Sequence, residues 1–198
     1  SVLEVDSALD GTVRNAGVSR YRELPDDHLE HVRSEAPSDD TVLLHVRTND
    51  SGVDIVQCAR TRVCLGGEVI EPDRATELGE RRAAQTLSVA VGQGEQLVVE
   101  KVVSLFTSRD DGVYSPSVAA RHAAFVAPGF DELLERHVTS WAHAWNRCRI
   151  SLYGDVGHTA RVLNLHIFHL LQTVSKNTAE IDAGVPARGL HGEAYRGH

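Results

Sequence analysis

The chain has 198 residues, with 20 Lys and Arg against 28 Asp and Glu, which gives a formal net charge of −8 without any block of basic residues. Nucleic acids and anionic membrane surfaces bind clustered positive charge, so this balance argues against both as partners. The length suffices to bury a core without disulfides or metals. No apolar run approaches the roughly 20 residues of a transmembrane helix, so we expect one domain, or one domain and part of a second.

The three cysteines indicate a reducing compartment. Cys58, Cys64 and Cys148 are an odd number and contain no CxxC spacing, which predicts free thiols rather than a disulfide framework. No charged-then-apolar leader opens the chain, and we predict a cytoplasmic protein. Because Ser1 leads directly into strand-like residues 2–5, we expect both ends of the chain to be cuts through a larger protein.

Residues 1 to about 110 are typical of β-structure. The β-branched run 41–48 lies between turn signals, and residues 53–65 alternate apolar and polar side chains. The residues expected on the polar face of that second strand are Asp54, Arg60 and Arg62. A long strand at 96–108 is apolar at odd and even positions, so both of its faces should be covered. Long strands separated by polar turns indicate an antiparallel β-sandwich, with 26–40 as a polar surface loop.

The periodicity then becomes helical. Residues 131–148 carry apolar side chains at i, i+4, i+7 and i+11, which are Leu134, Val138, Trp141 and Trp145. The two tryptophans could form a platform for a sugar, but their place on the apolar stripe favours a packing role. A second helix, predicted over about 156–175, is apolar nearly all round and needs burial on most sides.

Five stretches between residue 103 and the end of the chain form a recognisable series. They are Val-Ser-Leu-Phe-Thr-Ser-Arg-Asp at 103–110, Phe-Asp-Glu-Leu-Leu at 130–134 with the tryptophans beyond it, the segment 150–155, the helix 161–172, and Tyr-Arg-Gly-His at 195–198. In this order they resemble glycoside hydrolase family 65, the maltose, trehalose and kojibiose phosphorylases. The resemblance is close from Ser104 onward and looser before it.

This resemblance implies an α+β fold with three parts. Residues 1–111 would form the N-terminal β-sandwich and 112–148 a helical linker, while 149–198 would begin an (α/α)6 barrel that is truncated here. The implied partners are the rest of that barrel, an α-linked glucosyl disaccharide and inorganic phosphate, with no other cofactor; a homodimer stays open.

The implied reaction is inverting phosphorolysis, which yields β-glucose 1-phosphate and glucose. Phosphate is already an anion, so one general-acid Glu suffices, whereas an inverting glycosidase that uses water needs two carboxylates. In the family, that Glu and the phosphate site lie downstream of Tyr-Arg-Gly-His, so we expect no catalytic residue in this chain and no activity from it alone. A hydrolase of the same fold and a free-standing carbohydrate-binding or interaction module are the alternatives.

The terminal loop holds the candidate substrate-binding residues, and no metal ligand is expected there. They are Arg188, Glu193, Tyr195, Arg196 and His198. The guanidinium groups could clamp hydroxyl or carboxylate groups, or brace the loop. Glu193 could line a sugar pocket, hold one of the arginines or act as the acid, although the resemblance places the acid in another motif. Tyr195 could stack on a sugar or simply be packed.

Overall fold

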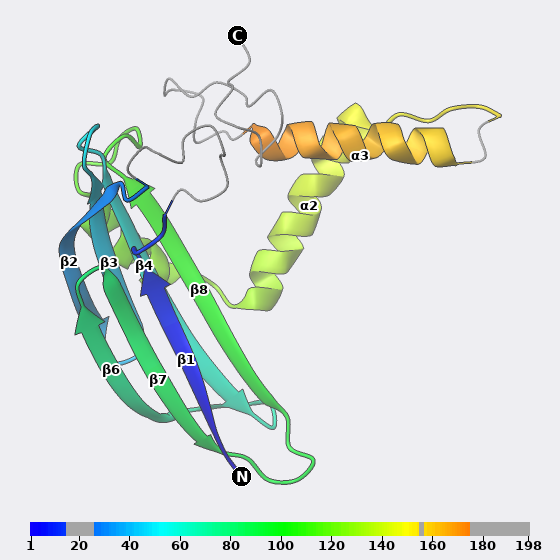
Figure 1. Ribbon diagram of the computed structural model, residues 1–198. Helices are drawn as coiled ribbons and strands as arrows, with labels where there is room; N and C mark the ends of the chain where they lie inside the picture. Colours follow the sequence, from blue (N-terminus) through cyan, green and yellow to red (C-terminus); the bar gives the residue numbers. More distant parts are fainter. Residues whose placement is uncertain (15–25, 155–156, 175–198) are drawn as a thin grey trace. The chain divides into compact units, whose positions relative to one another are not determined.

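The structure is a computed structural model that describes residues 1–14, 26–154 and 157–174 (Figure 1). The strands are β1 (Val2–Asp10), β2 (Leu29–Ser38), β3 (Thr41–Thr48), β4 (Asp54–Leu65), β5 (Glu68–Ile70), β6 (Asp73–Gly79), β7 (Arg82–Ala90) and β8 (Leu97–Thr107). The helices are α1 (Pro116–Val126), α2 (Phe130–Cys148) and α3 (His158–Thr173). The chain divides into two compact units, one of residues 1–130 and one from Asp131 onward. The predicted α+β class, with antiparallel sheets followed by helices, is confirmed.

Two antiparallel sheets face each other in the first unit. One has the strand order β1-β7-β6, and the other has the order β2-β3-β4-β5 with β8 also paired to β4. Alternation along β3 turns Leu44 toward the opposite sheet, where it meets Leu9 of β1 and Ala83 of β7 in one buried cluster. These contacts make the unit a β-sandwich, as the alternating pattern predicts.

Helix α1 covers the outer face of the five-stranded sheet. Leu43 and Cys58 of the sheet form a buried cluster with Ala120 and Ala124 of the helix. The helix begins where Ser115 caps it with its side chain and Pro116 takes the first turn. Its small buried residues let the helix lie close to the sheet, which makes a third layer that the sequence pattern did not predict.

The third layer covers Arg60, which lies on the predicted polar face of β4. Arg60 is only 4% exposed, because α1 lies over this part of β4. Arg60 Nη1 donates to the carbonyl of Phe125 at 2.8 Å and Nη2 to that of Ala127 at 2.7 Å. The guanidinium group therefore ties the end of α1 to the sheet.

Two predictions about the sandwich are wrong. Residues 26–40 contain the ten-residue strand β2 rather than only a loop; its polar side chains suit an edge strand, which β3 holds through backbone pairing. Strand β8 is not covered on both faces, because Val103 remains 45% exposed and Leu105 54% exposed. Both side chains belong to the face of β8 that carries Ala59 on the paired strand, and the facing sheet has only three strands.

The second unit is built on α2 and α3, which confirm the predicted helices at 131–148 and about 156–175. Trp141 of α2 lies 4.9 Å from Phe168 of α3 between ring centroids, and 6.2 Å from Trp145. Neither helix contains a fully buried residue. Among the described helices, none is long and apolar enough to cross a membrane.

Candidate functional site

The predicted substrate-binding residues of the terminal loop lie outside the described residues. These are Arg188, Glu193, Tyr195, Arg196 and His198. Their roles therefore stay predictions. The described part of the second unit includes α3, the helix that precedes this loop in the chain.

A concavity of about 660 Å³ lies in the second unit between the end of α2 and the start of α3. Its lining consists of Trp145, Arg149, Ile150, Ser151, Leu152, Gly157, Ala160, Arg161 and Asn164. Sequence reasoning did not single out this surface. The available signal was Asn164, a short polar residue in the interior of the predicted helix, and such a residue is expected to bond to backbone.

Asn164 gives the concavity its shape. Its Oδ1 accepts from the backbone N–H of Ile150 at 3.0 Å, and its Nδ2 donates to the carbonyl of Ile150 at 2.8 Å and to that of Ala160 at 2.7 Å. One side chain thus satisfies both backbone polar groups of Ile150, which would otherwise need water or another partner. The connection after α2 is held against α3 by this amide.

The described lining of the concavity can donate hydrogen bonds. Arg149, Ser151 and Arg161 are exposed, and they offer guanidinium and hydroxyl donors suited to sugar hydroxyls or to an anion. The described lining residues include no carboxylate. Proton donation to a leaving oxygen normally needs a carboxylic acid in a glycoside-cleaving site, so the described lining residues alone could bind a substrate without cleaving it.

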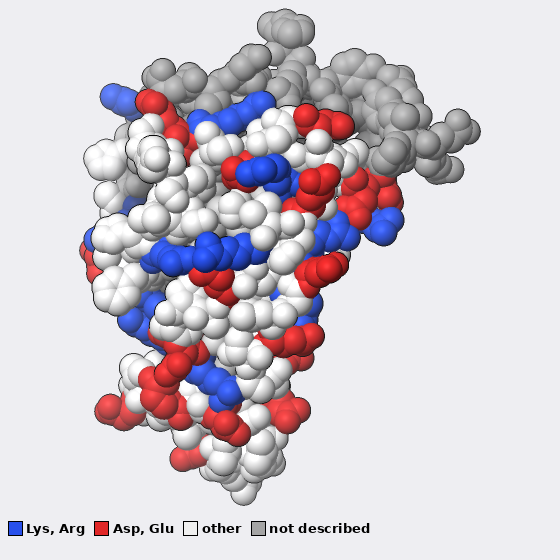
Figure 2. Space-filling model, turned by 90° about the vertical axis from the view of Figure 1, so that its left-hand side faces the viewer, with Lys and Arg blue, Asp and Glu red and all other residues white. Residues whose placement is uncertain are grey.

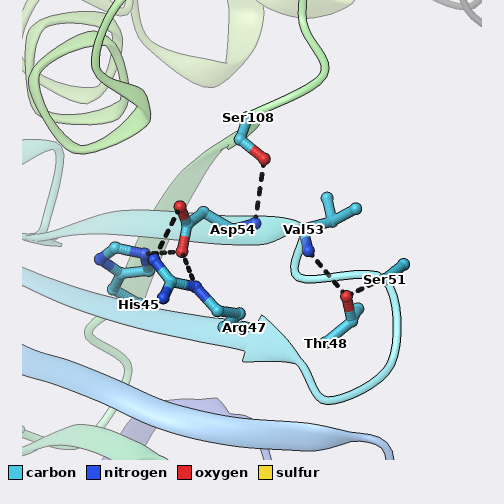
Figure 3. A network of polar contacts seen from close by, with 7 residues as sticks. All are labelled: His45, Arg47, Thr48, Ser51, Val53, Asp54 and Ser108. Carbon is cyan, nitrogen blue, oxygen red and sulfur yellow. Dashed lines mark hydrogen bonds and ion pairs between the residues drawn. The ribbon is translucent and has the colours of Figure 1, made fainter.

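A polar network lies at one end of β3 and β4 in the first unit (Figure 3). His45 Nε2 lies 2.9 Å from Asp54 Oδ1, while Arg47 Nε donates to the same oxygen at 2.8 Å and Arg47 Nη2 donates to Oδ2 at 3.1 Å. Ser108 Oγ accepts from the Asp54 backbone N–H at 3.1 Å. The serine hydroxyl is thus bonded to the backbone instead of to the imidazole, which is not the geometry of an activated nucleophile.

The network lowers the pKa of Asp54. The hydrogen bond from Arg47 is the main cause; desolvation by burial opposes it, and the bond from His45 adds to the lowering. Since Arg47 and His45 belong to β3 and Asp54 to β4, the charges stabilise the hairpin. We assign this cluster a structural role.

Asp54→Asn should lower the melting temperature at neutral pH, and the difference from the wild type should shrink in acid. A carboxyl whose folded-state pKa is lowered stabilises the fold above its unfolded value of about 4, and this contribution is lost as the pH falls through the folded pKa. Thermal unfolding of both proteins between about pH 7 and pH 2 measures this loss. Asp50→Asn, in the exposed turn of the same hairpin, is the control; a constant Asp54→Asn difference at all pH values would contradict the assignment.

Charges of both signs are interspersed on the face bordered by β2 and β6 (Figure 2). Glu35 of β2 pairs with Arg33 and with Arg121 of α1, and Glu77 of β6 pairs with Arg82. Mixed and paired charges create little net field, so this face offers no electropositive stretch for a polyanion. Among the described residues, no three His, Cys, Asp or Glu side chains are grouped so that they could hold a metal ion.

Two parts of the chain match two domains of one known protein family. Residues 1–144 match the N-terminal domain of glycosyl hydrolase family 65. Residues 164–198 match the central catalytic domain of the same family. The second match begins at Asn164 and includes the terminal loop with its candidate residues.

Curated relatives match nearly the whole chain. A protein of Mycobacterium tuberculosis described as an uncharacterized glycosyl hydrolase is 40% identical over 196 residues, which are 99% of this chain and 15% of that protein. Kojibiose phosphorylase of Caldanaerobacter subterraneus is 29% identical (100% of this chain, 26% of that protein), and trehalose 6-phosphate phosphorylase of Lactococcus lactis is 23% identical (99% and 24%). The chain thus spans roughly a quarter or less of these relatives' length. It belongs to glycosyl hydrolase family 65 and comprises that family's N-terminal domain followed by the beginning of its catalytic domain.

Proposed function

We propose that this chain is the N-terminal portion of an inverting glycoside phosphorylase. The whole protein would cleave an α-linked glucosyl disaccharide, of the kojibiose or trehalose kind, with phosphate to give β-glucose 1-phosphate and glucose. One observation carries the proposal: the two matches follow each other in one family's order, and two of the relatives are named phosphorylases.

Within this proposal, the chain contributes support and substrate contacts but not the chemical step. The donors that line the concavity, Arg149, Ser151 and Arg161, support a role in binding, and the general acid would lie in the rest of the whole enzyme. Arg188 and Arg196 of the terminal loop would donate to glucosyl hydroxyls, with Glu193, Tyr195 and His198 beside them. The domain limits that go with this proposal are 1–111, 112–148 and 149–198.

The proposal predicts that residues 1–198 alone are inactive, and that a chimera is active. In the chimera, the chain replaces the matching quarter of the Caldanaerobacter kojibiose phosphorylase. Loss of general-acid catalysis typically costs about 10²–10⁴-fold in rate, so the isolated chain should release no β-glucose 1-phosphate above a blank. The chimera should release it from kojibiose and phosphate, whereas the relative without its matching quarter should not. Product from the isolated chain, or a folded chimera without phosphorolysis, would contradict the proposal.

A hydrolase is the second candidate, because the 40% identical relative is described as a glycosyl hydrolase. The same assays distinguish the two chemistries. A hydrolase releases two sugars whether or not phosphate is present, whereas a phosphorylase forms one equivalent of glucose 1-phosphate for each bond cleaved and stops without phosphate.

A further inference from the structure

One side of the sandwich is open along two edge strands. Within the described residues, β1 pairs only with β7 and β8 pairs only with β4. Both strands border the same side, because Lys101 Nζ of β8 reaches across to the carbonyl of Ala8 in β1 at 2.7 Å (Figure 1). Edge strands of this kind present unpaired backbone donors and acceptors.

The register shows which backbone groups of β1 are free. Ser1 and Val91 exchange two backbone hydrogen bonds, at 2.9 and 2.7 Å, and the N–H of Gly11 donates to the carbonyl of Arg81 at 2.7 Å. With the register of β1 and β7, odd-numbered residues of β1 therefore bond to β7, and even-numbered residues turn their N–H and C=O groups away from it. Glu4 and Asp6 thus offer backbone groups along the edge, while the carbonyl of Ala8 is occupied by Lys101.

Apolar side chains lie uncovered on the same open side. Val103 and Leu105 of β8 and Leu3 of β1 are 45%, 54% and 44% exposed. All three side chains belong to the faces of β1 and β8 that turn inward. Leu9, on the same face of β1 as Leu3, packs in the core with Ala59. Ala59 is the register partner of Val103 and therefore shares its face of the sheet. A strand added beside Glu4 and Asp6 would place every second side chain on the inward side next to Leu3, whereas Val103 lies at the level of Leu9, further along β1.

The negative charge of β1 determines which kind of strand could pair with its free edge. The outward face of β1 carries the carboxylates of Glu4, Asp6 and Asp10 and no basic residue. Pairing of β1 with a second copy of itself would set these acids opposite one another, which is unfavourable, whereas basic residues opposite them would be favourable. The Thr86 hydroxyl donates to Asp6 Oδ1 at 2.8 Å and leaves its second oxygen for such a contact.

We propose that the free edge of β1 is a strand-addition site for a β-strand that alternates apolar with basic residues. Backbone bonds to Glu4 and Asp6 would hold the strand, apolar side chains would continue the inward side of β1 beside Leu3, and Lys or Arg would face the carboxylates. Lys101 would be displaced from Ala8 by a backbone N–H of the incoming strand. The site lies outside the catalytic-domain match and is independent of the proposed activity.

Amide hydrogen exchange of the 198-residue chain tests this site with two capped peptides. One is Thr-Lys-Val-Lys-Val-Lys-Thr, and the other is Thr-Glu-Val-Glu-Val-Glu-Thr. At saturating concentration the lysine peptide should slow exchange of the Glu4 and Asp6 amides by about 10-fold or more, because these N–H groups gain an acceptor. The Val5 amide, already turned toward β7, should change little. Equal protection by the glutamate peptide, or no protection by either, would overturn the proposal.

Two substitutions separate backbone pairing from charge. Glu4→Pro removes one outward N–H without touching the ladder to β7 and should abolish protection of Asp6. Glu4→Lys should weaken the lysine peptide and strengthen the glutamate peptide, whereas Asp111→Lys, in the exposed loop after β8, makes the same charge change and should do neither. Protection of Glu4 and Asp6 that grows with protein concentration in the absence of peptide would assign the edge to a second copy and refute the proposed occupant.

Discussion

Arg60→Ala should destabilise the first unit by about 3–5 kcal/mol, because it removes two hydrogen bonds from a charged donor, each worth roughly 1.5–3 kcal/mol. Arg60 is buried beneath α1 and donates to the carbonyls of Phe125 and Ala127. These carbonyls lie at the C-terminal end of the helix, where a cation also interacts favourably with the helix dipole. Without the guanidinium group, both carbonyls would lose their partner beside the sheet.

Urea unfolding followed by circular dichroism measures this loss. Arg62→Ala is the matched control, since Arg62 is exposed on the same strand and should shift the free energy of unfolding by no more than about 0.5 kcal/mol. Arg60→Met keeps the apolar stem and removes the donors, so it should account for most of the effect. If Arg60→Ala and Arg62→Ala unfold at the same urea concentration, α1 is held by other contacts, such as the bond from Ser104 Oγ to the Ala120 carbonyl.

Local patterns predicted the strands and helices whose stability comes from their own apolar side chains. Strand β3 has the predicted bounds because its β-branched and apolar run is buried almost throughout. Helix α2 likewise follows its stripe. Strand β2 has an exposed polar sequence, and only pairing with β3 makes it a strand, so its periodicity carried no signal.

Contacts between distant segments account for what local patterns could not predict. The burial of Arg60 depends on a helix that begins 56 residues later, and the exposure of Val103 depends on how many strands the opposite sheet has. For the candidate site, the family motif indicated the terminal loop, but it could not show that Asn164 would bond to Ile150 and shape a concavity. Ser-Pro at 115–116 followed by paired alanines at 119–120 and 123–124 was the available signal for α1.

The two units should unfold separately, the second one first. Every fully buried side chain of the described residues belongs to residues 1–130, whereas α2 and α3 contain none. Because buried apolar surface supplies most of the stability of a fold, we expect the second unit to unfold at a urea concentration lower by about 1 M or more.

Two probes report the units independently. Both tryptophans of the chain, Trp141 and Trp145, are in the second unit, so their fluorescence follows that unit alone. Cys58 reports the first unit: burial raises the pKa of its thiol to about 11, and it should react with a thiol reagent only when the sandwich opens. Cys64 and Cys148 are partly exposed, so both are replaced by Ser in the protein used for labelling.

Two core variants then complete the test. Phe168→Ala removes the ring that contacts Trp141 and should shift only the fluorescence transition. Leu87→Ala removes a fully buried side chain of the sandwich and should shift only the Cys58 transition, by about 2–5 kcal/mol. Coincident transitions that move together in both variants would mean that the helices and the sandwich unfold as one cooperative body, and the division at residue 130 would then have no energetic meaning.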